Sequence, residues 1–144
     1  MGSGKEGRRL SDNGYLLDTH ALIWVAGEHE KLNDNVIDLL SEESHRFYFS
    51  AVSIQEIAIK TALNNPLFNI DASALAEGLV KAGFSELNMP AEHALGLANL
   101  PEMHKDPFDR MLVSQAKVER LNLIANDGKF MKYCADFISL TEYC

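Results

Sequence analysis

Cysteine, positive charge and long apolar runs are all scarce in this sequence. Its 144 residues include two cysteines, Cys134 and Cys144, which are too few for a disulfide framework and lack the spacing of a metal site. No apolar stretch approaches the roughly 20 residues that a membrane-spanning helix needs, and the N-terminal segment has no apolar core of the kind found in signal peptides. These absences predict a cytoplasmic protein with no membrane partner.

Positive charge is outweighed by negative charge. Lysine and arginine number 13 against 21 aspartates and glutamates, which makes the formal net charge −8. Affinity for nucleic acid comes largely from cationic contacts to phosphates, so broad nucleic-acid binding is not expected. A nucleic acid could still be a substrate if divalent ions offset the acid locally. The same excess of acid would attract a basic partner protein.

The length and composition indicate one folded domain. A chain of this size fits a single domain, and its 47% hydrophobic and 24% charged residues are ordinary for a globular protein. Residues 1–13 are rich in glycine, serine and charge, and we expect them to be a flexible extension or a cloning remnant. The folded domain is therefore predicted over residues 14–144.

Strand-like and helix-like segments alternate along this domain. Short apolar runs predict strands at 14–17, 47–49, 84–89, 121–125 and 136–140. Helical spacing and capping residues predict helices at 19–26, 33–43, 53–63, 71–82, 91–99 and 106–119. The alternation predicts an α/β fold with helices on both faces of a mostly parallel sheet of about five strands.

Four carboxylates stand near the ends of these segments, and ligands of such sheets bind outside the carboxyl ends of the strands. They are Asp18, Glu56, Asp109 and Asp127. As a set they would repel one another unless a cation joined them, and oxygen ligands suit Mg²⁺ or Mn²⁺. Two such ions roughly 3.5–4 Å apart can stabilise both the attacking and the leaving oxygen in phosphodiester cleavage.

Each acid also has an ordinary structural explanation. Asp18 could cap a helix. Glu56 could complete a capping box with Ser53, or pair with Lys60 four residues on. The other two acids occupy a first helical turn and a tight turn before glycine, where acids are common. The functional interpretation therefore depends on the four acids together.

The acids lie in four blocks that read LDTHALIW from Leu17, SIQEIAIK from Ser53, HKDPFDRML from His104 and ANDGKF from Ala125. In order and spacing these blocks resemble the PIN-domain family, and most closely its VapC-like branch, the toxin nucleases of bacterial toxin–antitoxin pairs. The resemblance covers about residues 14–140. The fourth block departs from the more usual Thr-x-Asp or Thr-Arg-Asp pattern, since Ala125 and Asn126 precede its aspartate.

The resemblance implies a single PIN-like domain, an α/β/α sandwich, acting as a metal-dependent endoribonuclease on single-stranded RNA. The cofactor would be Mg²⁺ or Mn²⁺. The implied catalytic and metal-binding residues are Asp18, Glu56, Asp109 and Asp127, with Asp106 as an accessory. Candidate contacts to the RNA phosphates are Lys60, Lys105 and Arg110.

The resemblance also implies two protein partners, a second copy in a homodimer and a small antitoxin. The antitoxin would place an arginine or lysine beside the acids, because a guanidinium donates two parallel hydrogen bonds to a carboxylate. Two alternatives stay open at this point. One is a stand-alone PIN nuclease of RNA processing, and the other is a non-catalytic PIN-like module that binds RNA or protein.

Two other enzyme or signalling classes are disfavoured by residues near Asp18. A phosphatase of the haloacid dehalogenase type needs a second aspartate two residues after the first, and His20 occupies that position. A response-regulator receiver needs an acidic pair at its first strand-to-helix junction, and Thr19 and His20 follow Asp18 instead.

Overall fold

The computed structural model describes residues 14–100, 106–125 and 140–142. The predicted extension over 1–13 and the candidate residues Lys105 and Asp127 lie outside these ranges. In the part of the chain that is described, no helix is long and apolar enough to cross a membrane.

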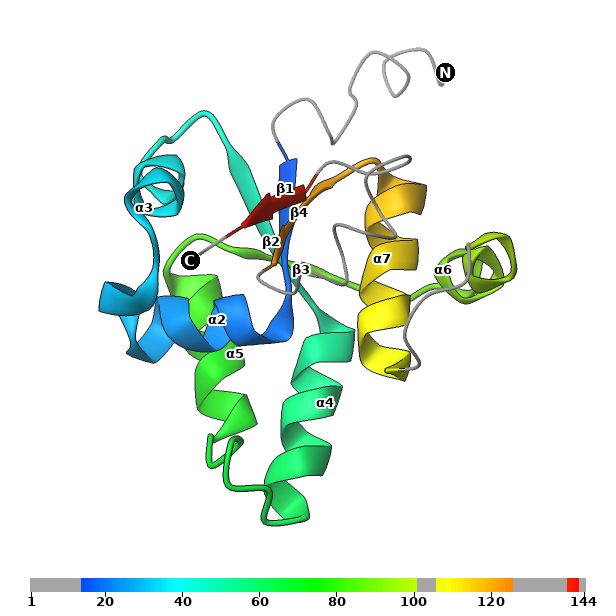
Figure 1. The fold of residues 1–144 in the computed structure, drawn as a ribbon, viewed down its shortest axis with the longest axis horizontal. Coiled ribbons are helices and arrows are strands. Elements are labelled where there is room, and N and C mark those ends of the chain that lie inside the picture. Colours follow the sequence, from blue (N-terminus) through cyan, green and yellow to red (C-terminus); the bar gives the residue numbers. More distant parts are fainter. Residues whose placement is uncertain (1–13, 101–105, 126–139, 143–144) are drawn as a thin grey trace.

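A parallel sheet forms the centre of the domain (Figure 1). Its strands are β1 (Gly14–Leu17), β2 (Arg46–Ser50), β3 (Ser85–Leu87), β4 (Asn122–Ala125) and β5 (Leu140–Glu142). They lie in the order β3-β2-β1-β4-β5, and each neighbouring pair is parallel. The predicted parallel sheet of about five strands is confirmed, although β5 extends beyond the predicted end of the last strand.

The helices lie close to their predicted positions. They are α2 (Thr19–Gly27), α3 (Asp34–Leu40), α4 (Ala51–Ala62), α5 (Ala72–Lys81), α6 (Ala91–Leu95) and α7 (Pro107–Glu119). Short 3₁₀ turns, η2 (His29–Lys31) and η3 (Gly96–Asn99), follow α2 and α6. Side chains of Asp18, Asn33, Asp71 and Asp106 cap α2, α3, α5 and α7, as their positions before apolar helical runs predict.

The start of α4 differs from the prediction. Ser50, the last residue of β2, is the cap, and its hydroxyl accepts a hydrogen bond of 2.9 Å from the backbone N–H of Val52. Ser53 therefore lies inside the first turn of the helix, and the predicted capping box between Ser53 and Glu56 is wrong. The physical reason is that the strand leads directly into the helix, so the capping position falls three residues earlier.

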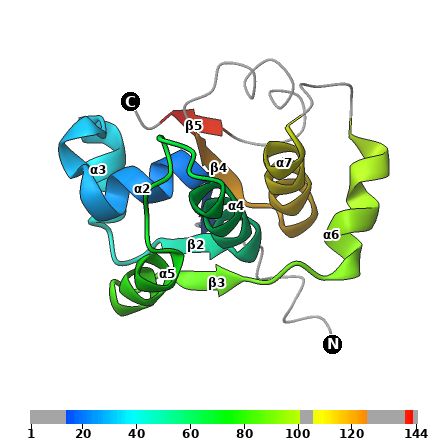
Figure 2. The ribbon, with the colours of Figure 1, turned by 90° about the horizontal axis from the view of Figure 1, so that it is seen from below.

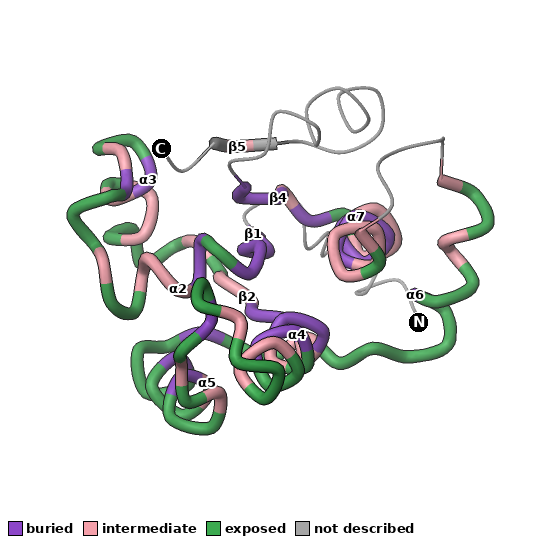
Figure 3. Tube along the Cα trace, turned by 60° about the horizontal axis from the view of Figure 1, so that its bottom comes forward, coloured by how far each residue is buried: buried purple, intermediate pink, exposed green. Residues whose placement is uncertain are grey.

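Alternate residues of the strands face opposite sides of the sheet and build two cores. Leu17 packs into one core with side chains of α2, α3 and α5, and Leu16 packs into the other with side chains of α7. Figure 2 shows α2 and α3 on one side of the sheet and α6 and α7 on the other. The central strands β1 and β4 between these layers are largely buried (Figure 3), which is typical of parallel sheets. This is the predicted α/β/α sandwich.

Candidate active site

Asp18 stands where β1 ends and α2 begins. Its backbone N–H donates a hydrogen bond of 2.9 Å to the carbonyl oxygen of Ile124 in β4. Its Oδ1 accepts a hydrogen bond of 2.8 Å from the N–H of Ala21, and only 6% of the residue is exposed. The carboxylate is thus oriented as a helix cap and held beside the carboxyl end of β4, the strand that leads toward Asp127 in the sequence.

Glu56 lies on α4 and is 3% exposed. Its Oε1 accepts a hydrogen bond of 2.6 Å from the hydroxyl of Thr19, the residue after Asp18. Its Oε2 lies 2.6 Å from the Nζ of Lys60, one helical turn further along α4. Of the two structural explanations considered for Glu56, the pair with Lys60 is therefore present, and a hydroxyl from the first junction completes its contacts.

Lys60 joins α4 to the start of α7. Its Nζ lies 4.9 Å from the centre of the Phe68 ring and 5.6 Å from the centre of the Phe108 ring. Both distances are within the range of a cation–π contact. Because Phe108 precedes Asp109 in the first turn of α7, this lysine links the surroundings of Glu56 to the segment that carries Asp109.

The start of α7 carries two acids and a base. Asp106 caps the helix, and its Oδ1 accepts hydrogen bonds of 2.9 Å and 3.2 Å from the N–H groups of Phe108 and Asp109. Asp109 and Arg110 are half-buried. The Nε of Arg110 is buried and has no hydrogen-bond partner among the described residues. A phosphate oxygen could accept a hydrogen bond from this Nε–H group.

The described part of the chain brings the segments of three candidate acids to one edge of the sheet. Their side chains do not form a complete set of metal ligands there. Within residues 14–100, 106–125 and 140–142, no three acidic, histidine or cysteine side chains lie close enough together to hold a metal ion. Both oxygens of Glu56 are engaged by Thr19 and Lys60. Carboxylate donors at this edge nevertheless fit the chemistry of a hard divalent cation.

A family model for the PIN domain matches residues 15–136, which is most of the chain. The chain belongs to the PIN domain family. No curated protein matches it in sequence.

Solved structures with the same fold include chains of VapBC and FitAcB. A chain of VapBC2 from Rickettsia felis, bound to a DNA fragment from the promoter, is 14% identical with a TM-score of 0.68 over 91% of this chain and 99% of that one. A chain of DNA-bound VapBC from Salmonella typhimurium is 15% identical with a TM-score of 0.64 over 91% and 98%. A chain of FitAcB from Neisseria gonorrhoeae is 20% identical with a TM-score of 0.60 over 88% and 95%. At these identities the likeness is one of fold.

Sequence reasoning missed a buried polar network that supports the site of this PIN domain. Gln115 of α7 is fully buried, and its Oε1 accepts a hydrogen bond of 2.6 Å from the hydroxyl of Ser50, the cap of α4. Its Nε2 donates to the carbonyl oxygen of Asn88 at 3.1 Å and lies 3.0 Å from Nδ1 of His93. The other ring nitrogen of His93 lies 2.7 Å from Glu119. One amide thus ties α4, α6 and α7 together.

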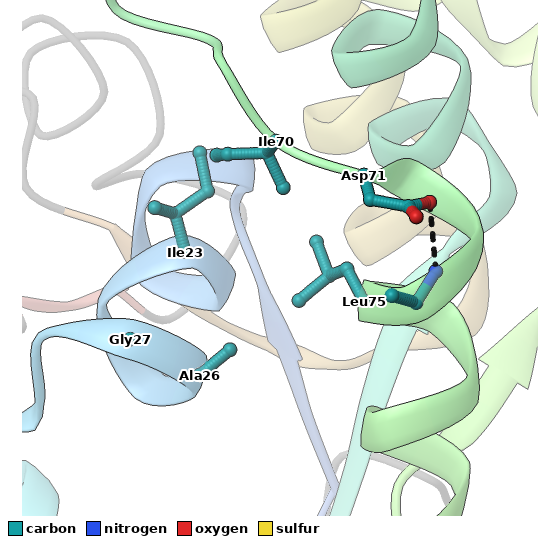
Figure 4. Close-up of a pocket in the computed structure, with 7 residues that line it drawn as sticks. Ile23, Ala26, Gly27, Ile70, Asp71 and Leu75 are labelled. Atoms are coloured by element: carbon teal, nitrogen blue, oxygen red, sulfur yellow. Dashed lines mark hydrogen bonds between the residues drawn. The ribbon is translucent and has the colours of Figure 1, made fainter.

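The PIN domain also has an apolar pocket that is separate from these acids (Figure 4). Its volume is about 310 Å³, and it lies between α2 and the segment that enters α5. The lining residues are Ile23, Ala26, Gly27, Ile70, Asp71, Ala74 and Leu75. Its acid, Asp71, accepts a hydrogen bond of 3.1 Å from the N–H of Ala74 as the cap of α5. The pocket therefore offers apolar contact surface and not catalytic groups.

Proposed function

We propose that this PIN domain is the toxin of a toxin–antitoxin pair and acts as a metal-dependent endoribonuclease on single-stranded RNA. The observation that carries the proposal is the pair of buried carboxylates, Asp18 and Glu56, linked through Thr19 at the carboxyl edge of the sheet. Burying ionised carboxylates is costly unless charge and hydrogen bonds compensate them. Two buried carboxylates at the carboxyl edge of a parallel sheet are therefore candidates for a functional site. Membership of the PIN family supports the same function.

The acids divide into proposed roles according to their surroundings. Asp18, Asp109 and Asp127 are the proposed metal ligands, with Asp106 as an accessory that orders the first turn of α7. Glu56 completes the predicted set of four acids and contacts Thr19 and Lys60. A bound Mg²⁺ or Mn²⁺ would polarise the phosphate and lower the pKa of water.

The chain itself orients the acids and the RNA. The N–H of Ala21 fixes the Asp18 carboxylate, and the cap of α7 fixes the turn that carries Asp109. Lys60, Lys105 and Arg110 are the proposed contacts to the RNA phosphates. Both described members of this set lie beside the acids, Lys60 on Glu56 and Arg110 next to Asp109 in sequence. Such contacts place the phosphodiester at the acidic edge despite the net charge of −8.

The test compares two aspartates that both cap a helix. Asp18→Asn should keep α2 capped, because asparagine caps helices as well as aspartate, but should lose RNA cleavage by more than the roughly 10–100-fold that an outer-shell partner of a metal contributes. Asp71→Asn is the matched control, since Asp71 caps α5 through the same type of hydrogen bond away from the acids. Wild-type cleavage by purified Asp18→Asn would show that the site is assigned wrongly.

A small antitoxin is the proposed partner. The VapBC and FitAcB complexes share this fold, and the acidic edge would attract an arginine or lysine of such a protein. The apolar pocket between α2 and α5 supplies the nonpolar contact area that a surface ion pair alone would not replace. Co-expression with any small neighbouring open reading frame should yield a co-purifying complex with suppressed nuclease activity. If no neighbouring protein binds, the alternative of a stand-alone PIN nuclease is favoured.

The predicted cytoplasmic location is consistent with an RNA substrate. A homodimer is the second proposed assembly. Large apolar side chains exposed on the described surface supply contact area for a second copy: Ile59, Leu63, Leu67, Val80, Met89 and Leu95. Light scattering at high protein concentration should give twice the mass of one chain. A monomeric mass there would contradict the dimer without affecting the nuclease proposal.

A further inference from the structure

The surroundings of Glu56 leave it poorly suited to ligate a metal ion directly. Its side chain is 4% exposed, and each of its oxygens already has a contact of 2.6 Å, one to a hydroxyl and one to an ammonium. Mg²⁺ demands near-octahedral geometry from its oxygen ligands, and a carboxylate oxygen held by a hydroxyl or an ammonium would have to give up that contact to bind it. The contacts of Glu56 are those of a carboxylate that holds protein groups in place.

Thr19 is part of this arrangement. Its hydroxyl has a single proton and also lies 3.0 Å from the hydroxyl of Ser53. An ionised carboxylate can only accept, so Thr19 donates to Glu56 and accepts from Ser53. The three side chains therefore form one directed chain of hydrogen bonds that ends on Glu56, which fixes the carboxylate opposite Lys60.

Lys60 is held on three sides. Glu56 binds its ammonium, and the rings of Phe68 and Phe108 lie within cation–π distance of it. Its side chain is 26% exposed, so it is not closed off from solvent. The surface pair of Lys31 and Glu28 is a contrast, since those side chains are 46% and 42% exposed. A lysine held in this way has a defined position before any ligand arrives.

We infer that Glu56 is a positioning residue for Lys60 and not a metal ligand. Lys60 then provides the second positive charge beside the RNA phosphate, as a compact cation that neutralises charge developing on the phosphate oxygens. This inference rests on the proposed function. It revises the prediction from sequence that Glu56 is one of the metal ligands.

Mn²⁺ titration of the full chain by calorimetry tests whether Glu56 ligates the metal. The wild type should bind Mn²⁺, and Asp18→Asn should lose that binding. The double variant Glu56→Gln/Lys60→Met removes one charge of each sign, so the local field nearly cancels and its dissociation constant for Mn²⁺ should stay within about threefold of wild type. The double variant is chosen because a single change would leave a buried charge without its partner and risk unfolding.

A double variant that loses Mn²⁺ as completely as Asp18→Asn does would overturn the inference. If this occurs while the wild type still cleaves RNA, the inference fails and the proposed function stands. A wild type that neither binds Mn²⁺ nor cleaves RNA would remove both.

The salt dependence of RNA binding tests the role of Lys60. On an Asp18→Asn background, which prevents cleavage, Glu56→Gln/Lys60→Met should lower the slope of log K against log salt for a single-stranded RNA oligonucleotide by about 0.7, the value for one lost phosphate contact. Glu28→Gln/Lys31→Met on the same background removes the exposed pair, is the control and should leave the slope unchanged. An unchanged slope for Glu56→Gln/Lys60→Met would contradict a phosphate contact.

Discussion

The hydroxyl of Thr19 donates a hydrogen bond of 2.6 Å to the buried carboxylate of Glu56, 37 residues further along the chain. Through this contact the junction after β1 and the body of α4 are held against each other. Asp18 precedes Thr19, so the geometry of one candidate acid depends on the other. The contact is therefore a place where stability and activity can be measured together.

Replacing Thr19 with valine should destabilise the fold. Valine keeps the shape of threonine but removes the hydroxyl, which leaves the buried Glu56 oxygen without its donor and costs about 1–3 kcal/mol of unfolding free energy. Urea denaturation measures the loss. Thr19→Ser keeps the hydroxyl and should recover most of the stability. Equal losses in the valine and serine variants would mean that the methyl group, and not the hydrogen bond, matters.

Replacing Gln115 with leucine should lower the free energy of unfolding more than the same replacement of a surface glutamine does. The side chain bonds to Ser50 and Asn88 and lies beside His93, so its removal leaves buried polar groups unpaired at about 1–3 kcal/mol each. Gln55→Leu, on the exposed side of α4, is the control and should stay within about 0.5 kcal/mol of wild type. Denaturant titrations of the two variants decide the matter, and similar midpoints would refute the role of the network.

Gly96 leaves no room for a side chain. A β-carbon there would lie 2.5 Å from Oγ of Ser114 and 3.2 Å from Cγ2 of Val118. Gly96→Ala should therefore destabilise the domain by about 1–3 kcal/mol through overpacking. Adding Ser114→Ala removes the nearest atom, so part of that loss should be regained.

The matched control for this change is Gly78→Ala. Nothing lies within 4 Å of a β-carbon at this position, which is in the exposed part of α5, so alanine should stabilise the helix by up to about 1 kcal/mol.

The clash at Gly96 would be contradicted if the losses of stability in Gly96→Ala and Ser114→Ala were strictly additive, because residues in contact are expected to couple.

Mn²⁺ should raise the melting temperature of the wild type. A ligand that binds only the folded chain stabilises it by about 2.7 kcal/mol at a concentration 100 times its dissociation constant. Asp18→Asn should show little of this shift, whereas Asp71→Asn should show all of it. The measurement is a thermal melt with and without Mn²⁺, and the same shift in all three proteins would point to binding elsewhere.

The sequence by itself determined the elements and their order. Asp18 and Asp106 cap α2 and α7 where local sequence predicts, because a cap bonds to N–H groups two or three residues on. Leu16 and Leu17 supply opposite cores because neighbouring side chains of a strand point to opposite faces. These features depend on residues close together in the chain, so a single sequence predicts them.

Only the tertiary structure decided what the polar side chains contact. Local spacing paired Glu56 with Ser53 as readily as with Lys60, but the direct passage from β2 into α4 moved the cap to Ser50 and left Glu56 to Thr19 and Lys60. Likewise, Ser50 and Gln115 are 65 residues apart and meet in the interior. Such contacts arise where strands and helices pack, and no periodic pattern along the chain specifies them.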